Sequence, residues 1–162
     1  MPPDPISDAS EFVAACVQLR SGVDRRVNID AAKALIETAA RRGATFIATP
    51  EMTNVVDQNA RRLLGGIDRE ADAFEVSEFA SLAARLQIWL LVGSLALRDD
   101  QEANDSGAAS AVNRSFLFAP DGAIAARYDK IHMFDVVLPD GESWRESSVY
   151  KPGSSSVVAA TG

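Results

Sequence analysis

The chain has 162 residues, which is enough for one domain with a buried core. Hydrophobic residues make up 47% of the sequence, charged residues make up 24%, and the formal net charge is −7. Because an acidic protein repels polyanions, we expect neither a nucleic acid nor an anionic membrane surface as its partner. No apolar run approaches the roughly 20 residues that a membrane-spanning helix requires. The composition is typical of a globular protein, and we treat residues 1–162 as one domain.

The chain contains one cysteine, Cys16, and one histidine, His132. A single cysteine cannot form an internal disulfide, which is typical of a reducing compartment, and we therefore expect a cytoplasmic location. These two side chains are too few for a Cys/His zinc site, so we expect no metal. Residues 1–10 are rich in proline and acid, do not resemble a signal peptide, and are interpreted as a lead-in.

The first strand and the first helix are predicted within residues 12–43. Residues 12–19 are almost continuously apolar, which predicts a strand that is covered on both faces. Cys16 stands in the middle of this strand, where we expect a buried and chemically inert thiol. From Asn28 onward apolar residues recur at helical spacing, and Gly43 ends the predicted helix.

A second strand brings an acidic residue to the edge of the predicted sheet. Residues 44–49 indicate a buried strand, and Pro50 ends it because proline has no N–H for the ladder. Glu51 therefore emerges at the carboxyl end of a strand, which is the edge where open α/β sheets bind ligands. Residues 52–67 are predicted to form a long loop, with its paired glycines as a hinge.

The same alternation of helix and strand continues along the chain. Residues 76–86 have the apolar spacing of a second helix, and residues 88–97 predict a third, mostly apolar strand. Residues 98–110 are rich in acids, Asn, Ser and Gly, and are interpreted as an exposed connection. Strands that alternate with helices in this way predict a layered α/β domain.

The last third of the chain begins with a hairpin pattern. Two strand-like runs, 112–118 and 123–128, flank an Asp-Gly turn at 121–122. The segment 139–153 is predicted to be irregular, and residues 156–160 are predicted to begin another strand.

Lys130 stands among apolar and aromatic residues directly after this hairpin. Burial lowers the pKa of a lysine and a nearby carboxylate raises it, so such a residue is either a structural ion pair or a catalytic cation. By itself the stretch favours the structural ion pair. Two glutamates, Glu51 and Glu146, change this interpretation because each lies just outside a strand or on a loop. We expect Glu51 and Lys130 to leave the same end of the sheet and to lie within ion-pair distance.

Six short motifs occur in a fixed order along the chain, and each one alone is common. They are Pro50-Glu51, Asn113-Arg114-Ser115, Asp121-Gly122, Tyr128-Asp129-Lys130-Ile131-His132, Glu146-Ser147 and Pro152-Gly153. As an ordered set they resemble the nitrilase superfamily of carbon–nitrogen hydrolases. The stretch 128–147 most resembles the branch that includes deaminated-glutathione amidase and omega-amidase. The resemblance implies an α/β fold, the nitrilase-type α-β-β-α sandwich, of which residues 1–162 form an incomplete first part.

The resemblance also implies an amidase of small linear amides that works through a cysteine thioester. It assigns Glu51 as the general base and acid, Lys130 as the cation at the oxyanion, and Glu146 as the second glutamate, which positions the lysine and the substrate. Since a base of this kind is favoured by a pKa raised through burial, we expect a raised pKa for Glu51. His132 and Asn113 are candidate substrate contacts, and a structural role stays open for both. No metal and no organic cofactor are implied.

In this family the nucleophilic cysteine follows the second glutamate and one further strand, and the sequence ends at Gly162 before that point. We therefore interpret residues 1–162 as a hydrolase domain cut before its nucleophile, and we expect this chain alone to be inactive. One alternative is a non-catalytic family remnant that binds a small acid or pairs with a subunit. Within the family, a nitrilase or an N-carbamoyl hydrolase is also open. The resemblance implies a homodimer or higher homo-oligomer for the full-length protein.

Overall fold

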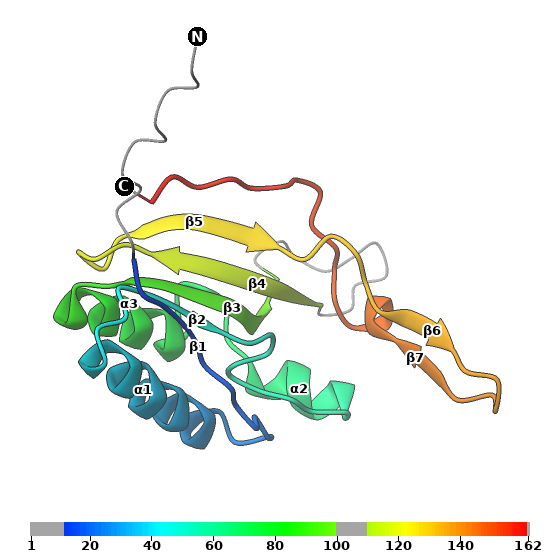
Figure 1. Ribbon diagram of the computed structural model, residues 1–162. Coiled ribbons are helices and arrows are strands. Elements are labelled where there is room, and N and C mark those ends of the chain that lie inside the picture. The colour runs from blue at the N-terminus through cyan, green and yellow to red at the C-terminus, as the bar shows by residue number, and fades with distance from the viewer. Residues whose placement is uncertain (1–11, 100–109, 162) are drawn as a thin grey trace, which may run out of the picture.

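The computed structural model describes residues 12–99 and 110–161. These residues form a five-stranded mixed sheet in the order β1-β2-β3-β4-β5, with helices α1 and α3 packed along one of its faces (Figure 1). The strands are β1 (Ala14–Cys16), β2 (Phe46–Thr49), β3 (Trp89–Arg98), β4 (Ala111–Phe118) and β5 (Ile124–Asp129). The helices are α1 (Arg25–Arg41), α2 (Ala60–Gly66) and α3 (Phe74–Leu86).

The topology confirms the predicted layered α/β domain. Strands β1, β2 and β3 are parallel, whereas β4 and β5 add to the sheet as an antiparallel hairpin. The hairpin turns at the predicted position, where Gly122 has a φ of +86°. A β-carbon at Gly122 would lie 2.8 Å from the carbonyl oxygen of Ala80 in α3, so glycine suits both the turn and the helix beside it.

The core lies between the sheet and the two long helices. Helix α1 begins at Arg25, three residues before the predicted start at Asn28. The Asp24 side chain caps it by accepting a hydrogen bond from the Val27 N–H. The largest fully buried apolar side chains come from both layers: Ile29, Ile36, Phe79 and Leu82 from the helices, and Ile47, Leu90, Val92, Leu95, Leu97, Phe116 and Phe118 from the strands. Each such side chain stabilises the fold by about 1.5–3 kcal/mol through burial.

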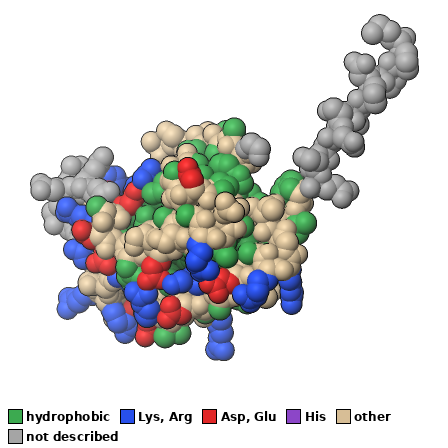
Figure 2. All heavy atoms as spheres, turned by 90° about the vertical axis from the view of Figure 1, so that its left-hand side faces the viewer, with side chains coloured by type: hydrophobic (Ala, Val, Ile, Leu, Met, Phe, Trp, Pro, Cys, Tyr) green, Lys and Arg blue, Asp and Glu red, His purple; other side chains and the backbone are tan. Residues whose placement is uncertain are grey.

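The opposite face of the sheet is covered less completely. Phe46 and Ala48 on β2 and Leu91 on β3 point away from the helical layer and are only partly buried. Seen from the left-hand side of Figure 1, charged side chains gather over the lower, helical part, and hydrophobic atoms gather above it (Figure 2). The prediction that residues 12–19 form a strand covered on both faces is therefore wrong, because α1 and α3 pack on one face of the sheet and the β1 residues Ala14 and Cys16 are exposed.

Cys16 shows this correction most clearly, since it was expected to be buried. It is exposed, because β1 is a three-residue strand at the edge of the sheet and pairs with β2 alone. A continuous apolar run in the sequence cannot distinguish a central strand from an edge strand.

Three further segments differ from the predictions. Part of the predicted loop 52–67 is helix α2, which is capped by the Asn59 side chain and buries Leu63 despite the two glycines in its last turn. The predicted irregular segment 139–153 contains strand β7 (Ser143–Arg145) and the 3-10 turn η1 (Glu146–Ser148). Strand β7 forms a hairpin with β6 (Asp135–Val137), which precedes that segment. Residues 156–160 form no strand among the described residues and are exposed. Residues 1–10 and most of the connection 98–110 lie outside the described residues.

Candidate active site

Glu51 lies at the carboxyl edge of the parallel strands, in a tight turn after β2. The next residue, Met52, has a φ of 54°, a left-handed conformation that is costly for a residue with a side chain. The turn is held against β3 by backbone bonds: Thr53 N donates to Ser94 O at 2.8 Å, and Ser94 N donates to Pro50 O at 3.0 Å. These bonds fix the direction in which the Glu51 side chain leaves the sheet.

Lys130 follows β5, and its backbone is held from two sides. Its N–H donates to Asn113 O on β4, and its carbonyl accepts from Gly153 N, both at 2.9 Å. Its ammonium Nζ lies 2.9 Å from Glu51 Oε1 and 2.8 Å from Glu146 Oε2. The expected proximity of Glu51 and Lys130 is thus confirmed, although 79 positions separate them.

Glu146 reaches this lysine from the 3-10 turn that follows the β6–β7 hairpin. Its Oε2 also accepts a hydrogen bond of 2.6 Å from the backbone N–H of Phe134. The carboxylate of Asp135 accepts hydrogen bonds from both the N–H and the hydroxyl of Ser147, the residue after Glu146, at 3.0 and 2.5 Å. The hairpin therefore returns the chain so that Glu146 faces the residues that follow β5. The sequence pattern did not reveal this hairpin because its strands are only three residues long.

Asn113 completes a ring around the lysine from the middle of β4. Its Nδ2 donates to Glu51 Oε1 at 2.7 Å and lies 3.5 Å from Glu146 Oε1. Its Oδ1 accepts a hydrogen bond from the Ser94 hydroxyl, which orients the amide with its NH₂ group toward the two carboxylates. Asn113 and Ser94 are both buried. A neutral donor between two like charges stabilises them without adding another charge.

The pKa values of the two main partners follow from this geometry. Burial raises the pKa of Glu51, but hydrogen bonds from Lys130 and Asn113 outweigh it, so the pKa lies below the ordinary value. The expectation of a raised pKa was therefore wrong for the described structure, in which the Glu51 side chain is 55% exposed. Burial lowers the pKa of Lys130, but Glu146 and Glu51 outweigh it, so that pKa lies above the ordinary value. Both groups are ionised at neutral pH.

The other predicted site residue lies apart from this ring. His132 is exposed, and in the described part of the chain no hydrogen bond or ion pair links it to Glu51, Lys130 or Glu146. Its role in substrate binding stays a prediction. Within the same residues, no group of three or more His, Cys, Asp or Glu side chains is close enough to hold a metal ion. No described helix combines the length and apolarity needed to cross a membrane.

Tyr150 is a neighbour of the site that the motifs did not indicate. Its hydroxyl donates to the sulfur of Met52 at 3.8 Å, directly beside Glu51 in the chain. Burial raises its pKa, and the negative charges of Glu146 and Glu51 raise it further, so the phenol stays protonated. The only sequence signal was an aromatic residue within a few positions of Glu146, and Trp144 carries the same signal while being exposed.

The amino-acid sequence of this chain is similar to those of known proteins. Residues 13–162 match the family model described as carbon-nitrogen hydrolase. A deaminated glutathione amidase from Yersinia enterocolitica is 34% identical over 148 residues, covering 91% of this chain and 49% of that protein. An omega-amidase from Homo sapiens is 27% identical over 146 residues, covering 90% and 49%. The chain therefore spans about half the length of the curated relatives it matches.

Solved structures give the same result for the fold. The NitFhit protein of Caenorhabditis elegans superposes with a TM-score of 0.71 at 26% identity, over 87% of this chain and 33% of that one. The Nit3 protein of Saccharomyces cerevisiae, a member of the nitrilase superfamily, gives 0.69 at 21% identity, over 88% and 49%. The α/β fold of the described residues is thus the nitrilase-superfamily fold, represented by one helical layer and one five-stranded sheet.

Proposed function

We propose, from the premise that this chain belongs to the carbon–nitrogen hydrolase family, that it supplies the acid–base and oxyanion-stabilising side of an amidase active site. The observation that carries the proposal is the ring in which Lys130 Nζ lies 2.9 Å from Glu51 Oε1 and 2.8 Å from Glu146 Oε2. Amidases among the relatives support a small linear amide as the substrate class.

In this proposal Glu51 moves the protons. It takes the proton of a cysteine thiol, the thiolate attacks the amide carbon, and the C=O π electrons move to the oxygen. When the tetrahedral intermediate collapses, the C–N bond breaks and Glu51 returns the proton to the departing nitrogen. Glu51 then takes a proton from water, and the hydroxide adds to the thioester carbon. When this second intermediate collapses, the C–S bond breaks, the carboxylic acid leaves, and Glu51 returns its proton to the cysteine thiolate. A pKa below the ordinary value keeps Glu51 ionised and ready to accept the first proton.

Lys130 stabilises the oxyanion that forms in both halves of the reaction. An ammonium has three donors, and the two carboxylates of the described structure take two of them. The third donor can point toward the developing charge while Glu146 keeps the lysine in place. Because the pKa of Lys130 lies above the ordinary value, this positive charge persists throughout.

The nucleophile of the proposal is a cysteine outside residues 1–162. Cys16 lies on edge strand β1 and lines a groove with residues of α1, such as Leu35 and Ala39, rather than with the ring. The first test is therefore to read the gene beyond the codon for Gly162. The proposal expects an open frame that encodes a cysteine after one further strand. A stop codon, with no separately encoded chain that completes the site, overturns it in favour of a non-catalytic remnant.

The second test measures the role of Glu51 in the full-length protein. Glu51→Gln keeps the shape of the side chain and removes the base, so kcat for a small omega-amide should fall by about a hundredfold or more. Glu78→Gln is the matched control, because Glu78 pairs with Arg26 and Lys33 between the two helices. A kcat for Glu51→Gln equal to that of the control contradicts the assignment.

A further inference from the structure

Asn54, three residues after Glu51, joins the catalytic turn to the neighbouring strand through its side chain. It is fully buried. Its Oδ1 accepts from the N–H of Ala96 at 2.8 Å, and its Nδ2 donates to the carbonyl of Ala96 at 2.9 Å. One side-chain amide thus makes both hydrogen bonds that an adjacent strand residue would make with β3. The end of the turn is fixed to the sheet where no strand continues.

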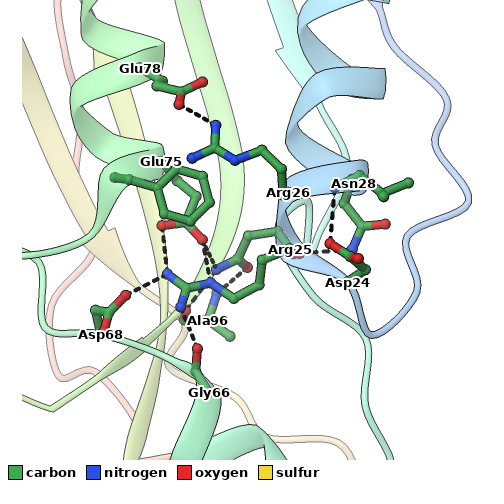
Figure 3. A network of polar contacts seen from close by, with 12 residues as sticks. Asp24, Arg25, Arg26, Asn28, Gly66, Asp68, Glu75, Glu78 and Ala96 are labelled. Carbon is green, nitrogen blue, oxygen red and sulfur yellow. Dashed lines mark hydrogen bonds and ion pairs between the residues drawn. The ribbon is translucent and has the colours of Figure 1, made fainter.

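A buried carboxylate, Glu75 at the start of α3, lies behind this amide. Its Oε1 accepts from Asn54 Nδ2 at 3.4 Å and from Arg25 Nε at 2.6 Å. Its Oε2 accepts from a second nitrogen of the same guanidinium at 2.8 Å. Arg25 also binds Asp68 at 2.8 Å and the carbonyl of Gly66, so α1, α3 and the end of α2 meet at one point (Figure 3).

A buried ion pair of this kind is weak evidence for a stabilising role. Desolvation of two charges offsets most of their attraction, and an apolar pair of similar volume is often equally stable or more so. Positioning offers a better account of why the chain places Glu75 there. The left-handed Met52 lies between Glu51 and the Thr53–Asn54 pair, and such a backbone conformation persists only when its surroundings hold it.

We propose that Glu75 is a positioning residue: through Asn54 it fixes the turn 51–54 so that the Glu51 carboxylate meets Lys130. The geometric part concerns the described structure alone. Its consequence for catalysis rests on the proposed function of Glu51. The network touches none of the reacting atoms, and its effect passes through the backbone of the turn.

The adjacent ion pair provides a matched comparison. Arg26 follows Arg25 on α1, and Glu78 lies one turn after Glu75 on α3, so the two pairs join the same helices (Figure 3). The described contacts of Glu78 are with Arg26 and Lys33, and it does not bond to the turn. Glu78→Gln therefore removes a charge between α1 and α3 without disturbing Asn54.

The experiment measures the Glu51 carboxylate directly in the full chain of residues 1–162. Carbon-13 NMR of glutamate-labelled protein follows the titration of Glu51 in wild type, Asn54→Ala, Glu75→Gln and Glu78→Gln. In Asn54→Ala we expect the Glu51 pKa to rise toward the ordinary glutamate value, because the turn relaxes and the contact with Lys130 is lost. Glu78→Gln should titrate as wild type. Glu75→Gln, whose amide oxygen can still accept a hydrogen bond from Asn54, should retain most of the wild-type titration of Glu51.

A second variant keeps the test decisive if Asn54→Ala loses its cooperative melting transition. Arg25→Met combined with Glu75→Leu replaces the ion pair with apolar side chains of similar volume, which preserves packing while removing the acceptor for Asn54. An unchanged Glu51 pKa in either folded variant overturns the proposal. Failure of the proposed function is a separate result: Glu51→Gln then keeps its full-length activity, whereas the titration of Glu51 still responds to Asn54.

Discussion

Arg25 and Lys130 each hold two carboxylates, and they do so in opposite ways. Arg25 binds Glu75 and Asp68 next to the turn 51–54, and the Glu75 side chain is 0% exposed. Lys130 binds Glu51 and Glu146 at the edge of the sheet, where the Glu51 side chain is 55% exposed. Both clusters carry one positive and two negative charges, so charge alone does not separate a structural element from a candidate site.

The difference lies in how the donors of each cation are used. The planar guanidinium of Arg25 donates to two carboxylates and one backbone carbonyl in a fixed geometry, and it stacks over the Phe74 ring. The ammonium of Lys130 uses two of its three donors on the described partners, and the lysine side chain is 26% exposed. A guanidinium whose nitrogens all donate to the protein holds the helices in place. An ammonium with one donor left over can bind a developing negative charge.

The largest effect should come from breaking the Arg25 cluster on one side. Glu75→Ala removes one of the two carboxylates that pair with the largely buried guanidinium of Arg25. The free energy of unfolding should therefore fall by about 3–5 kcal/mol. Urea unfolding of the 162-residue chain measures it. Glu78→Ala, which alters the more exposed neighbouring pair, is the control and should cost much less. Equal losses in the two variants would contradict the contrast between buried and exposed pairs.

The second effect should appear in activity rather than in stability. In the full-length protein Lys130→Ala removes the cation from the oxyanion, so kcat should fall by about a hundredfold or more, and KM should change less. The unfolding midpoint should change less than it does in Glu75→Ala. Steady-state assays of ammonia release, together with melting curves, measure both quantities. A variant that melts early but turns over normally would assign Lys130 a structural role.

The sequence predicted one of these clusters and not the other. Glu51, Lys130 and Glu146 belong to recognisable motifs next to strand ends, and the structure brings them within hydrogen-bond distance. Arg25 and Glu75 belong to no motif, and their partnership depends on how two helices pack, which periodicity does not specify. In the same way, the spacing predicted β2 and β3 but gave no sign that β1 lies at the edge.

The third prediction concerns how the free energy of unfolding depends on pH. It follows from the directions in which the pKa values of Glu51 and Lys130 are shifted. The lowered pKa of Glu51 adds stability that is present above the ordinary value of 4.5 and is lost as pH falls through the folded pKa. The raised pKa of Lys130 adds stability that is present below 10.5 and is lost as pH rises through the folded pKa. The stability difference between wild type and Lys130→Met should therefore be largest between these limits and shrink beyond both.

Urea unfolding across the pH range measures this difference. The double variant Glu51→Gln with Lys130→Met is the control, because neither position titrates in it. We expect a modest effect, since Glu51 is half exposed and solvent screens the pair. A difference that stays constant through the acid limit would mean that Glu51 does not contribute to the pair in solution.

The smallest effect concerns Cys16, which belongs to neither cluster. Because its side chain is exposed on edge strand β1, a neutral alkylating reagent should label it stoichiometrically in the native chain. Lys130→Ala should not change the labelling rate, since the groove around Cys16 is lined by residues of β1 and its flanks, of α1, and of the segment between α1 and β2. Glu75→Ala should raise the rate modestly, because it loosens α1 against the sheet. Mass spectrometry of timed samples measures all three rates.

Strong protection of Cys16 in the native wild type would show that this edge of the sheet is covered in solution. A labelling rate that changed with Lys130→Ala would show that the two regions are coupled.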